Sequence, residues 1–124
     1  METFSIKDNK DSQFAFEIEN IYLSLNKVGK LLSTLEGIKI NKIRKPFEAS
    51  EYLIEFDYKG RLYEVWEPFG DSSRYWIGPK KGAEEMGNNE IKEIEDVFKQ
   101  YEINPFVKLI GDLLSLKIFS RKKN

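Results

Sequence analysis

The sequence of 124 residues contains no cysteine and no histidine. Without cysteine, disulfides and thiolate metal sites are excluded. Without histidine, the most common general base near neutral pH is missing, together with the usual nucleophile–base pairs and most transition-metal ligands. Any catalysis would depend on carboxylates, lysine, tyrosine or serine. These absences favour binding over catalysis, and they predict that the protein has no metal and no cofactor.

A long uninterrupted apolar run is also missing. Residues 1–8 include acids and a lysine where a secretion signal requires an apolar stretch. The most apolar segment, 105–119, is interrupted by Lys108, Asp112 and Lys117, and it is too short to span a bilayer. We therefore expect a cytoplasmic protein with no membrane partner.

The charges are balanced overall but segregated along the chain. Twenty Lys and Arg residues stand against 21 Asp and Glu residues, for a formal net charge of −1. Because nucleic-acid-binding domains of this size are usually clearly basic, the balance disfavours a nucleic-acid partner. Segment 84–102 carries seven acids and two bases, whereas segment 105–124 carries five bases and one acid. Solvated helix faces explain both segments, but an acidic helix can also cover a basic surface of a partner.

The first part of the chain predicts a helix. Between residues 18 and 35 an apolar residue recurs every three or four positions, and Gly37 stands where a helix C-cap glycine belongs. Apolar residues also alternate over 14–18, so a short strand can precede a helix that begins near Asn20. Residues 1–12 are mostly polar, and they form either a short edge strand or a disordered segment.

The middle of the chain predicts an antiparallel meander. Residues 51–58 and 61–67 alternate with period two, and Lys59-Gly60 between them is typical of a two-residue hairpin turn. Residues 38–43 and 74–77 are the neighbouring strands. Helical patterns follow over 90–101 and after Asn104-Pro105, and residues 120–124 are expected to fray.

These elements predict one α+β domain that spans residues 1–124. We expect an antiparallel meander of three to five strands, with an N-terminal helix and two C-terminal helices packed mainly on one face.

The strongest candidate site is the aromatic cluster between residues 66 and 76. Tyr75 and Trp76 are adjacent on a strand, so their side chains must point to opposite faces of the sheet. If helices cover only one face, one of the two lies near solvent. Core packing explains part of the cluster, but aromatics mixed with arginine and acids are also typical of interface hot spots. The candidate contact residues are Trp66, Glu67, Phe69, Asp71, Arg74, Tyr75 and Trp76 in this cluster, and Glu90, Glu93, Glu95 and Asp96 on the acidic helix.

The hypothesis from the sequence is a small non-enzymatic protein-interaction module. Its most concrete form is a cytosolic immunity or antitoxin-type protein that neutralises a toxin with a basic surface. The alternative is a small-ligand or carboxylate-dependent enzyme site where Glu67, Asp71 and Arg74 converge. Docking on nucleic acid through the basic C-terminal segment ranks last because the net charge is near neutral.

Overall fold

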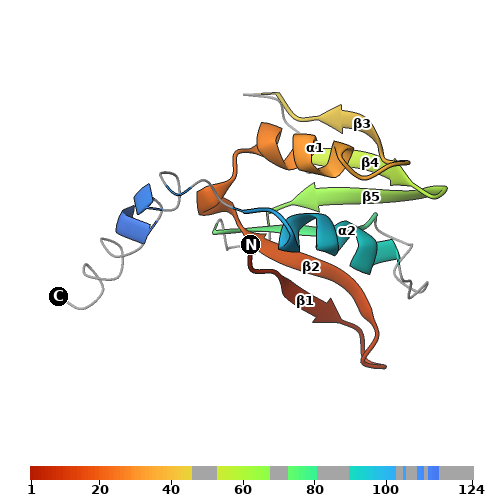
Figure 1. Cartoon of the computed structure of the whole chain (residues 1–124). Coiled ribbons are helices and arrows are strands. Elements are labelled where there is room, and N and C mark those ends of the chain that lie inside the picture. The colour runs from red at the N-terminus through yellow and green to blue at the C-terminus, as the bar shows by residue number, and fades with distance from the viewer. Residues whose placement is uncertain are drawn as a thin grey trace.

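The computed structural model describes residues 1–45, 53–67, 73–80 and 90–102, together with residues 105, 109–110 and 112–114. Within these residues the chain forms a six-stranded antiparallel sheet with the strand order β1-β2-β6-β5-β4-β3 (Figure 1). The elements are β1 (Phe4–Lys7), β2 (Gln13–Glu19), the 3-10 turn η1 (Asn20–Tyr22), α1 (Leu25–Ser33), β3 (Lys39–Ile43), β4 (Ile54–Tyr58), β5 (Arg61–Trp66), β6 (Arg74–Pro79) and α2 (Glu90–Lys99). The α+β class and the antiparallel sheet are confirmed, whereas the predicted strand count of three to five was too low.

The N-terminal part of the chain differs from the prediction. The structure begins with the hairpin β1–β2, and residues 18–22 belong to the end of β2 and to η1, so the expected helix does not start there. Residues 14–18 form a strand, as their alternation indicates, because residues 16–19 of β2 pair with β6 and the strand also pairs with β1. Helix α1 begins at Leu25, where the Ser24 side chain accepts a hydrogen bond of 3.2 Å from the backbone N–H of Lys27.

The hairpin β4–β5 follows the predicted pattern. Lys59 and Gly60 both have positive φ, 51° and 79°, which is the conformation of a turn whose twist matches the flanking strands. In this register Phe56 lies opposite Tyr63, and their rings stack with centroids 5.5 Å apart. Gly37 also has positive φ, but α1 ends at Ser33, so this glycine shapes the connection to β3 and does not cap the helix.

The core lies between the sheet and helices α1 and α2, on the face that we call the helix face. In-register rows of apolar residues cross the sheet there, for example Phe16, Ile77, Val65 and Ile54. The helices cover these rows with buried side chains from one stripe of each helix. The helix contribution consists of Val28, Leu31 and Leu32 from α1 and Ile91, Ile94 and Phe98 from α2.

The described C-terminal residues are helical, but they do not pack on the sheet. Residues 105, 109–110 and 112–114 lie on a segment that extends away from the body of the molecule (Figure 1). The prediction that a second C-terminal helix covers the sheet is therefore wrong for these residues. Residues 120–124, which were expected to fray, lie outside the described part of the chain. In the described part, no helix has the length and apolarity needed to cross a membrane.

Candidate binding surface

The sheet face opposite α1 and α2, which we call the open face, carries both tryptophans. In the described part of the chain, the α-helices that contact the sheet lie on the other face (Figure 1). Pairing of β1, β2, β6 and β5 places Phe4, Glu17, Trp76 and Trp66 in one row across four strands. Both indoles are partly exposed. Aromatic side chains thus stand in the middle of a sheet face that no α-helix of the described residues covers.

Tyr75 and Trp76 point to opposite faces, as the alternation predicts. Tyr75 is 8% exposed and belongs to the core of the helix face. Its hydroxyl donates a hydrogen bond of 3.4 Å to the backbone carbonyl of Leu23, and burial raises the pKa of this phenol. Tyr75 is therefore a structural residue, and Trp76 is the residue of this pair that a partner can reach.

The position of Trp76 on the open face is fixed by its neighbours. The indole lies over the backbone of Gly78 and beside Ala15, since a Cβ atom at position 78 would come within 3 Å of both side chains. The ring of Trp66 meets it edge-on, with centroids 5.8 Å apart and planes at 62°. This packing holds the exposed aromatic surface in one geometry before any partner binds.

Arg74 links the central strand β6 to β2 and to the edge strand β1. Its guanidinium carbon lies 3.8 Å from the ring centroid of Phe4, and Nη1 lies 3.3 Å from Glu17 Oε1. Stacking and ion pairing together orient a planar guanidinium well. The open face therefore has a polar border beside its aromatic centre, as interfaces commonly do.

The structure does not bring together the charged residues of the predicted ligand site. Arg74 pairs with Glu17 on the open face, whereas Glu67 follows the end of β5 and is exposed. Asp71 and Phe69 lie outside the described residues. No ion pair joins Glu67 to Arg74, both of which the structure describes. The convergence of the three charged side chains thus has no support in the described part.

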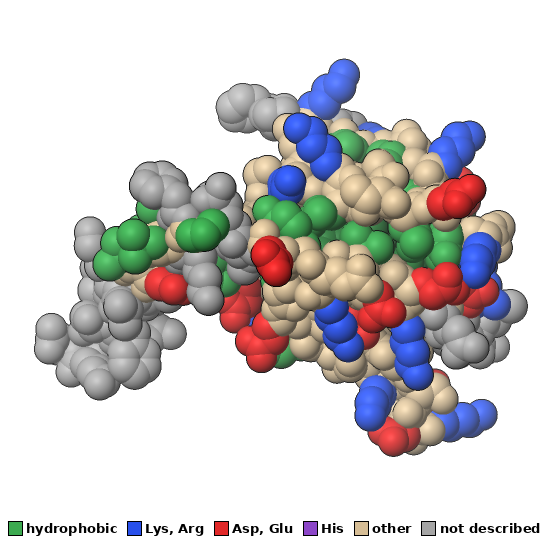
Figure 2. Space-filling model, in the orientation of Figure 1, with side chains coloured by type: hydrophobic (Ala, Val, Ile, Leu, Met, Phe, Trp, Pro, Cys, Tyr) green, Lys and Arg blue, Asp and Glu red, His purple; other side chains and the backbone are tan. Residues whose placement is uncertain are grey.

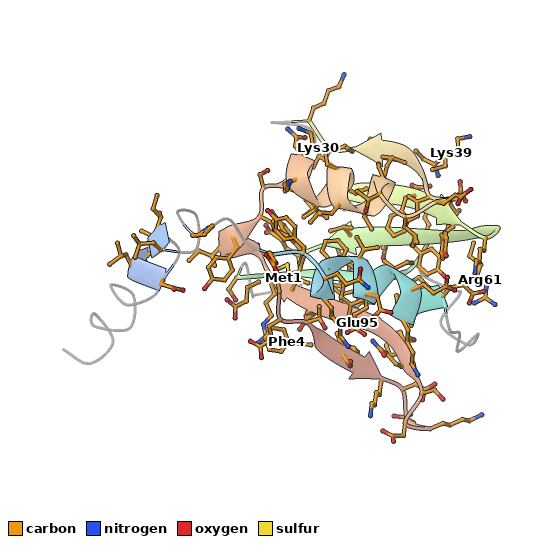
Figure 3. All side chains as sticks on the ribbon, viewed as in Figure 1. Met1, Phe4, Lys30, Lys39, Arg61 and Glu95 are labelled. Atoms are coloured by element: carbon orange, nitrogen blue, oxygen red, sulfur yellow. The ribbon has the colours of Figure 1, made fainter. Side chains whose placement is uncertain are left out.

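Glu95 is part of the fold and not of an acidic surface. It is 2% exposed and lies between α2 and β1 (Figure 3). Its carboxylate accepts hydrogen bonds from Thr3 Oγ1 at 2.9 Å, Ser5 Oγ at 3.4 Å and Gln13 Nε2 at 3.2 Å. The sequence had suggested a solvent-facing contact residue. The buried position has a clear reason, because this carboxylate joins α2 to the N-terminal hairpin.

Glu93 is also engaged within the chain. It accepts hydrogen bonds from the Tyr58 hydroxyl at 2.7 Å and from Lys59 Nζ at 2.9 Å. The Lys59 ammonium lowers the pKa of Glu93. Of the four predicted acids of α2, Asp96 is exposed, Glu90 and Glu93 are partly exposed and Glu95 is buried, so the acidic surface is smaller than the sequence indicated.

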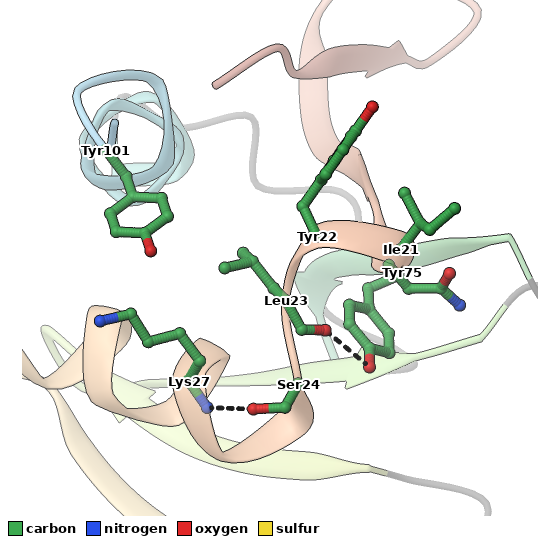
Figure 4. A pocket seen from close by; sticks show the side chains of 8 residues that line it. Ile21, Tyr22, Leu23, Ser24, Lys27, Tyr75 and Tyr101 are labelled. Carbon is green, nitrogen blue, oxygen red and sulfur yellow. Dashed lines mark hydrogen bonds between the residues drawn. The ribbon is translucent and has the colours of Figure 1, made fainter. Parts of the chain in front are cut away.

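The structure also reveals a pocket that sequence reasoning missed. A depression of about 700 Å³ lies where η1 and the start of α1 meet Tyr75 and Tyr101 (Figure 4). Lys27 Nζ lies 5.2 Å from the centroid of the Tyr101 ring. On its border the Tyr22 hydroxyl donates a hydrogen bond of 2.8 Å to Asp112 Oδ1, which raises the pKa of Tyr22 to about 12. These residues are far apart in sequence, so no local pattern could have indicated the pocket.

The carboxylates of the described residues do not form a metal site, since no group of three or more of them is placed to hold an ion. No family model matches this chain, and no significant similarity to a curated protein or to a solved structure was found. The open face is therefore the feature from which a function can be inferred.

Proposed function

We propose that this chain is a protein-interaction module that binds a protein partner through the open face. The observation that carries the proposal is the Trp66–Trp76 pair, which stands partly exposed on a sheet face that no described helix covers. Tryptophan is enriched among the residues that dominate binding energy, particularly at the centre of an interface. A tryptophan pair with no role in the core is better explained by a partner than by folding.

The rigidity of this surface supports the same function. Trp76 is held against Gly78 and Ala15, and Arg74 is held between Phe4 and Glu17. Side chains that are already ordered lose little conformational entropy on association, which improves affinity for a given contact area. The open face is thus suited to recognise a folded surface without rearrangement.

The charges around the tryptophans favour a partner with basic groups. On the three central strands β2, β6 and β5, Glu17 and Glu19 are partly exposed on the open face and Glu64 is buried there, against one cation of these strands on that face, Arg74. Lys80 follows β6 and pairs with Glu55 of β4 at 3.4 Å. Complementary charge speeds association and selects among partners. The concrete form that we propose is a cytosolic immunity or antitoxin-type protein, with the open face covering a basic region of a toxin.

Site-directed cross-linking in cells tests which face binds. A photoreactive amino acid at Leu62, which is exposed on the open face, is compared with one at Lys30, which is exposed on α1. We expect one protein to cross-link from position 62 and not from position 30, and the product to disappear when Trp66→Ala is added. Equal cross-linking from both positions, or a product that persists with Trp66→Ala, would contradict the proposal.

The toxin-neutralising form has a separate test. The candidate partner is the product of a neighbouring gene, produced alone and together with this chain. Co-expression of the wild type is expected to restore growth, and Trp66→Ala is expected to protect less. Neighbouring products that are harmless alone, or that stay toxic beside the wild type, would exclude this form while leaving protein binding to the cross-linking test.

A further inference from the structure

The pocket between η1, the start of α1 and Tyr101 has the size and lining of a small-molecule site. Its volume of about 700 Å³ lies within the range of roughly 300–1,000 Å³ that is usual for ligand pockets. Much of its wall consists of aromatic and aliphatic side chains, which are Ile21, Tyr22, Leu23, Tyr75 and Tyr101. A pocket of this size is suited to an organic molecule and is larger than a single inorganic ion requires.

The innermost part of the pocket is apolar. Leu23 and Tyr75 are 3% and 8% exposed, so they form the deepest part of the lining. The Tyr75 hydroxyl donates its hydrogen bond to the backbone carbonyl of Leu23, so these two polar groups satisfy each other. The apolar surfaces of the two side chains therefore remain for contact with a ligand.

Two polar groups at the mouth of the pocket face the same space. Lys27 Nζ lies 5.2 Å from the centroid of the Tyr101 ring, and the Tyr101 hydroxyl points into the pocket (Figure 4). Among the described residues, no carboxylate forms an ion pair with Lys27, and no group forms a hydrogen bond with the Tyr101 hydroxyl. An ammonium and a phenolic O–H can both donate, so together they suit an acceptor that carries negative charge.

Helix α1 adds positive charge on this side of the molecule. Its two charged residues, Lys27 and Lys30, are both bases, and Figure 2 shows basic side chains gathered over this helix. Ser24 caps α1 and also lines the pocket, so the positive end of the helix dipole lies beside it. These charges favour an anion at the Lys27 side of the pocket.

The acids nearest to Tyr22 do not oppose an anion there, because neither of them lines the pocket. Asp112 accepts a hydrogen bond from the Tyr22 hydroxyl, which points away from Lys27 (Figure 4). Glu19 lies on the open face, opposite Arg74 of β6. The ammonium of Lys27 is therefore left to a ligand.

We propose that this pocket binds a small organic anion in which a carboxylate is joined to an aromatic ring. The carboxylate pairs with Lys27 and accepts a hydrogen bond from Tyr101, while the ring packs on Leu23 and the tyrosines. This site is separate from the tryptophan surface, because Tyr75 lines the pocket from the helix face and its neighbour Trp76 lies on the open face.

Titration of the full chain with phenylacetate, followed by amide NMR, tests the proposal. We expect shift changes at residues 20–27 and at Tyr101, whereas the indole N–H signals of Trp66 and Trp76 stay unchanged. Phenylacetamide has the ring without the charge, and acetate has the charge without the ring. Each should bind at least roughly tenfold more weakly than phenylacetate.

Lys27→Met removes the ammonium and keeps an apolar side chain. The capping bond to Ser24 comes from the backbone N–H of Lys27, so α1 stays capped in this variant. We expect Lys27→Met to bind phenylacetate at least roughly tenfold more weakly than the wild type, and Tyr101→Phe roughly threefold more weakly. The matched control is Lys30→Met, the same change at an exposed lysine of α1, which should bind as the wild type does.

Circular dichroism should show that all variants are folded. The proposal is overturned if phenylacetate leaves the pocket signals unchanged up to its solubility limit. It is also overturned if phenylacetamide binds as tightly as phenylacetate, or if Lys27→Met binds as tightly as the wild type. None of these outcomes bears on partner binding by the tryptophans, which the cross-linking experiment tests on the other face.

Discussion

The indole of Trp76 occupies the space that a side chain at Gly78 would need. A Cβ atom at position 78 would lie 2.6 Å from Trp76 Cη2, 2.9 Å from Cζ2 and 2.7 Å from Ala15 Cβ. Real Cβ atoms do not approach other atoms so closely, and the ring belongs to a partly exposed tryptophan. The glycine thus shapes the surface that we assign to partner binding, while the core lies on the opposite face.

Gly78→Ala should therefore destabilise the protein and displace Trp76. Because the methyl group meets the ring and Ala15, we expect the free energy of unfolding to fall by roughly 1–3 kcal/mol. Urea denaturation followed by tryptophan fluorescence measures this loss. In a Trp76→Ala background the same substitution should cost less, since one of the two clashing groups is gone. An equal cost in both backgrounds would show that the ring does not occupy this space.

Glu95→Ala should weaken the attachment of β1 to α2. Removing the carboxylate leaves the donors of Thr3, Ser5 and Gln13 without their acceptor, which is expected to cost roughly 1–3 kcal/mol. The neighbouring Asp96→Ala should change stability by less than about 0.5 kcal/mol, because Asp96 is exposed. Similar losses for the two variants in thermal or urea unfolding would refute a structural role specific to Glu95.

The contact of Glu93 with Lys59 predicts a pH dependence. The pKa of Glu93 is lowered in the folded state, so its stabilisation is fully present above the pKa of the unfolded chain. The stabilisation is lost as the pH falls through the folded pKa, where the carboxyl group becomes protonated. Glu93→Gln should therefore be less stable than the wild type at neutral pH, and the difference should vanish in acid.

Urea midpoints of the wild type and Glu93→Gln over a pH series measure this difference. Asp96→Asn, an exposed acid on the same helix, is the control and should match the wild type at every pH. A difference between wild type and Glu93→Gln that stays constant from neutral to acid pH would show that ionisation of Glu93 does not stabilise the fold.

The local elements could be predicted because their signals are local. Period-two alternation and the Lys59-Gly60 pair identify the hairpin β4–β5, and the same alternation separates Tyr75 from Trp76. The pairing of β2 with β6 joins residues 55 to 61 positions apart, and no local pattern encodes it. The sheet was therefore expected to be narrower than it is, because the N-terminal hairpin was not placed beside the meander.

The burial of Glu95 could have been found from the sequence. Glu95 lies four residues after Ile91 and three before Phe98, so it belongs to the same helical stripe as these core residues. Its charge suggested a solvent-facing residue, but hydrogen-bond donors on β1 and β2 make the buried position favourable. The informative feature was the position of Glu95 in the helical periodicity of α2. This position predicts burial better than residue type does when hydrogen-bond donors for the carboxylate are present.

The central claim is that the tryptophans of the open face bind a partner. The most direct test measures the unfolding free energy and the affinity for the partner on the same variant. Trp66→Ala is compared with Tyr101→Ala, which removes a partly buried aromatic on the helix side. For the cross-linked partner, we predict that Trp66→Ala weakens binding at least about tenfold while changing the unfolding free energy by about 1 kcal/mol or less. Tyr101→Ala should leave affinity unchanged. An unchanged affinity for Trp66→Ala, together with a loss of roughly 3–5 kcal/mol in stability, would show that this tryptophan serves the fold and not a partner.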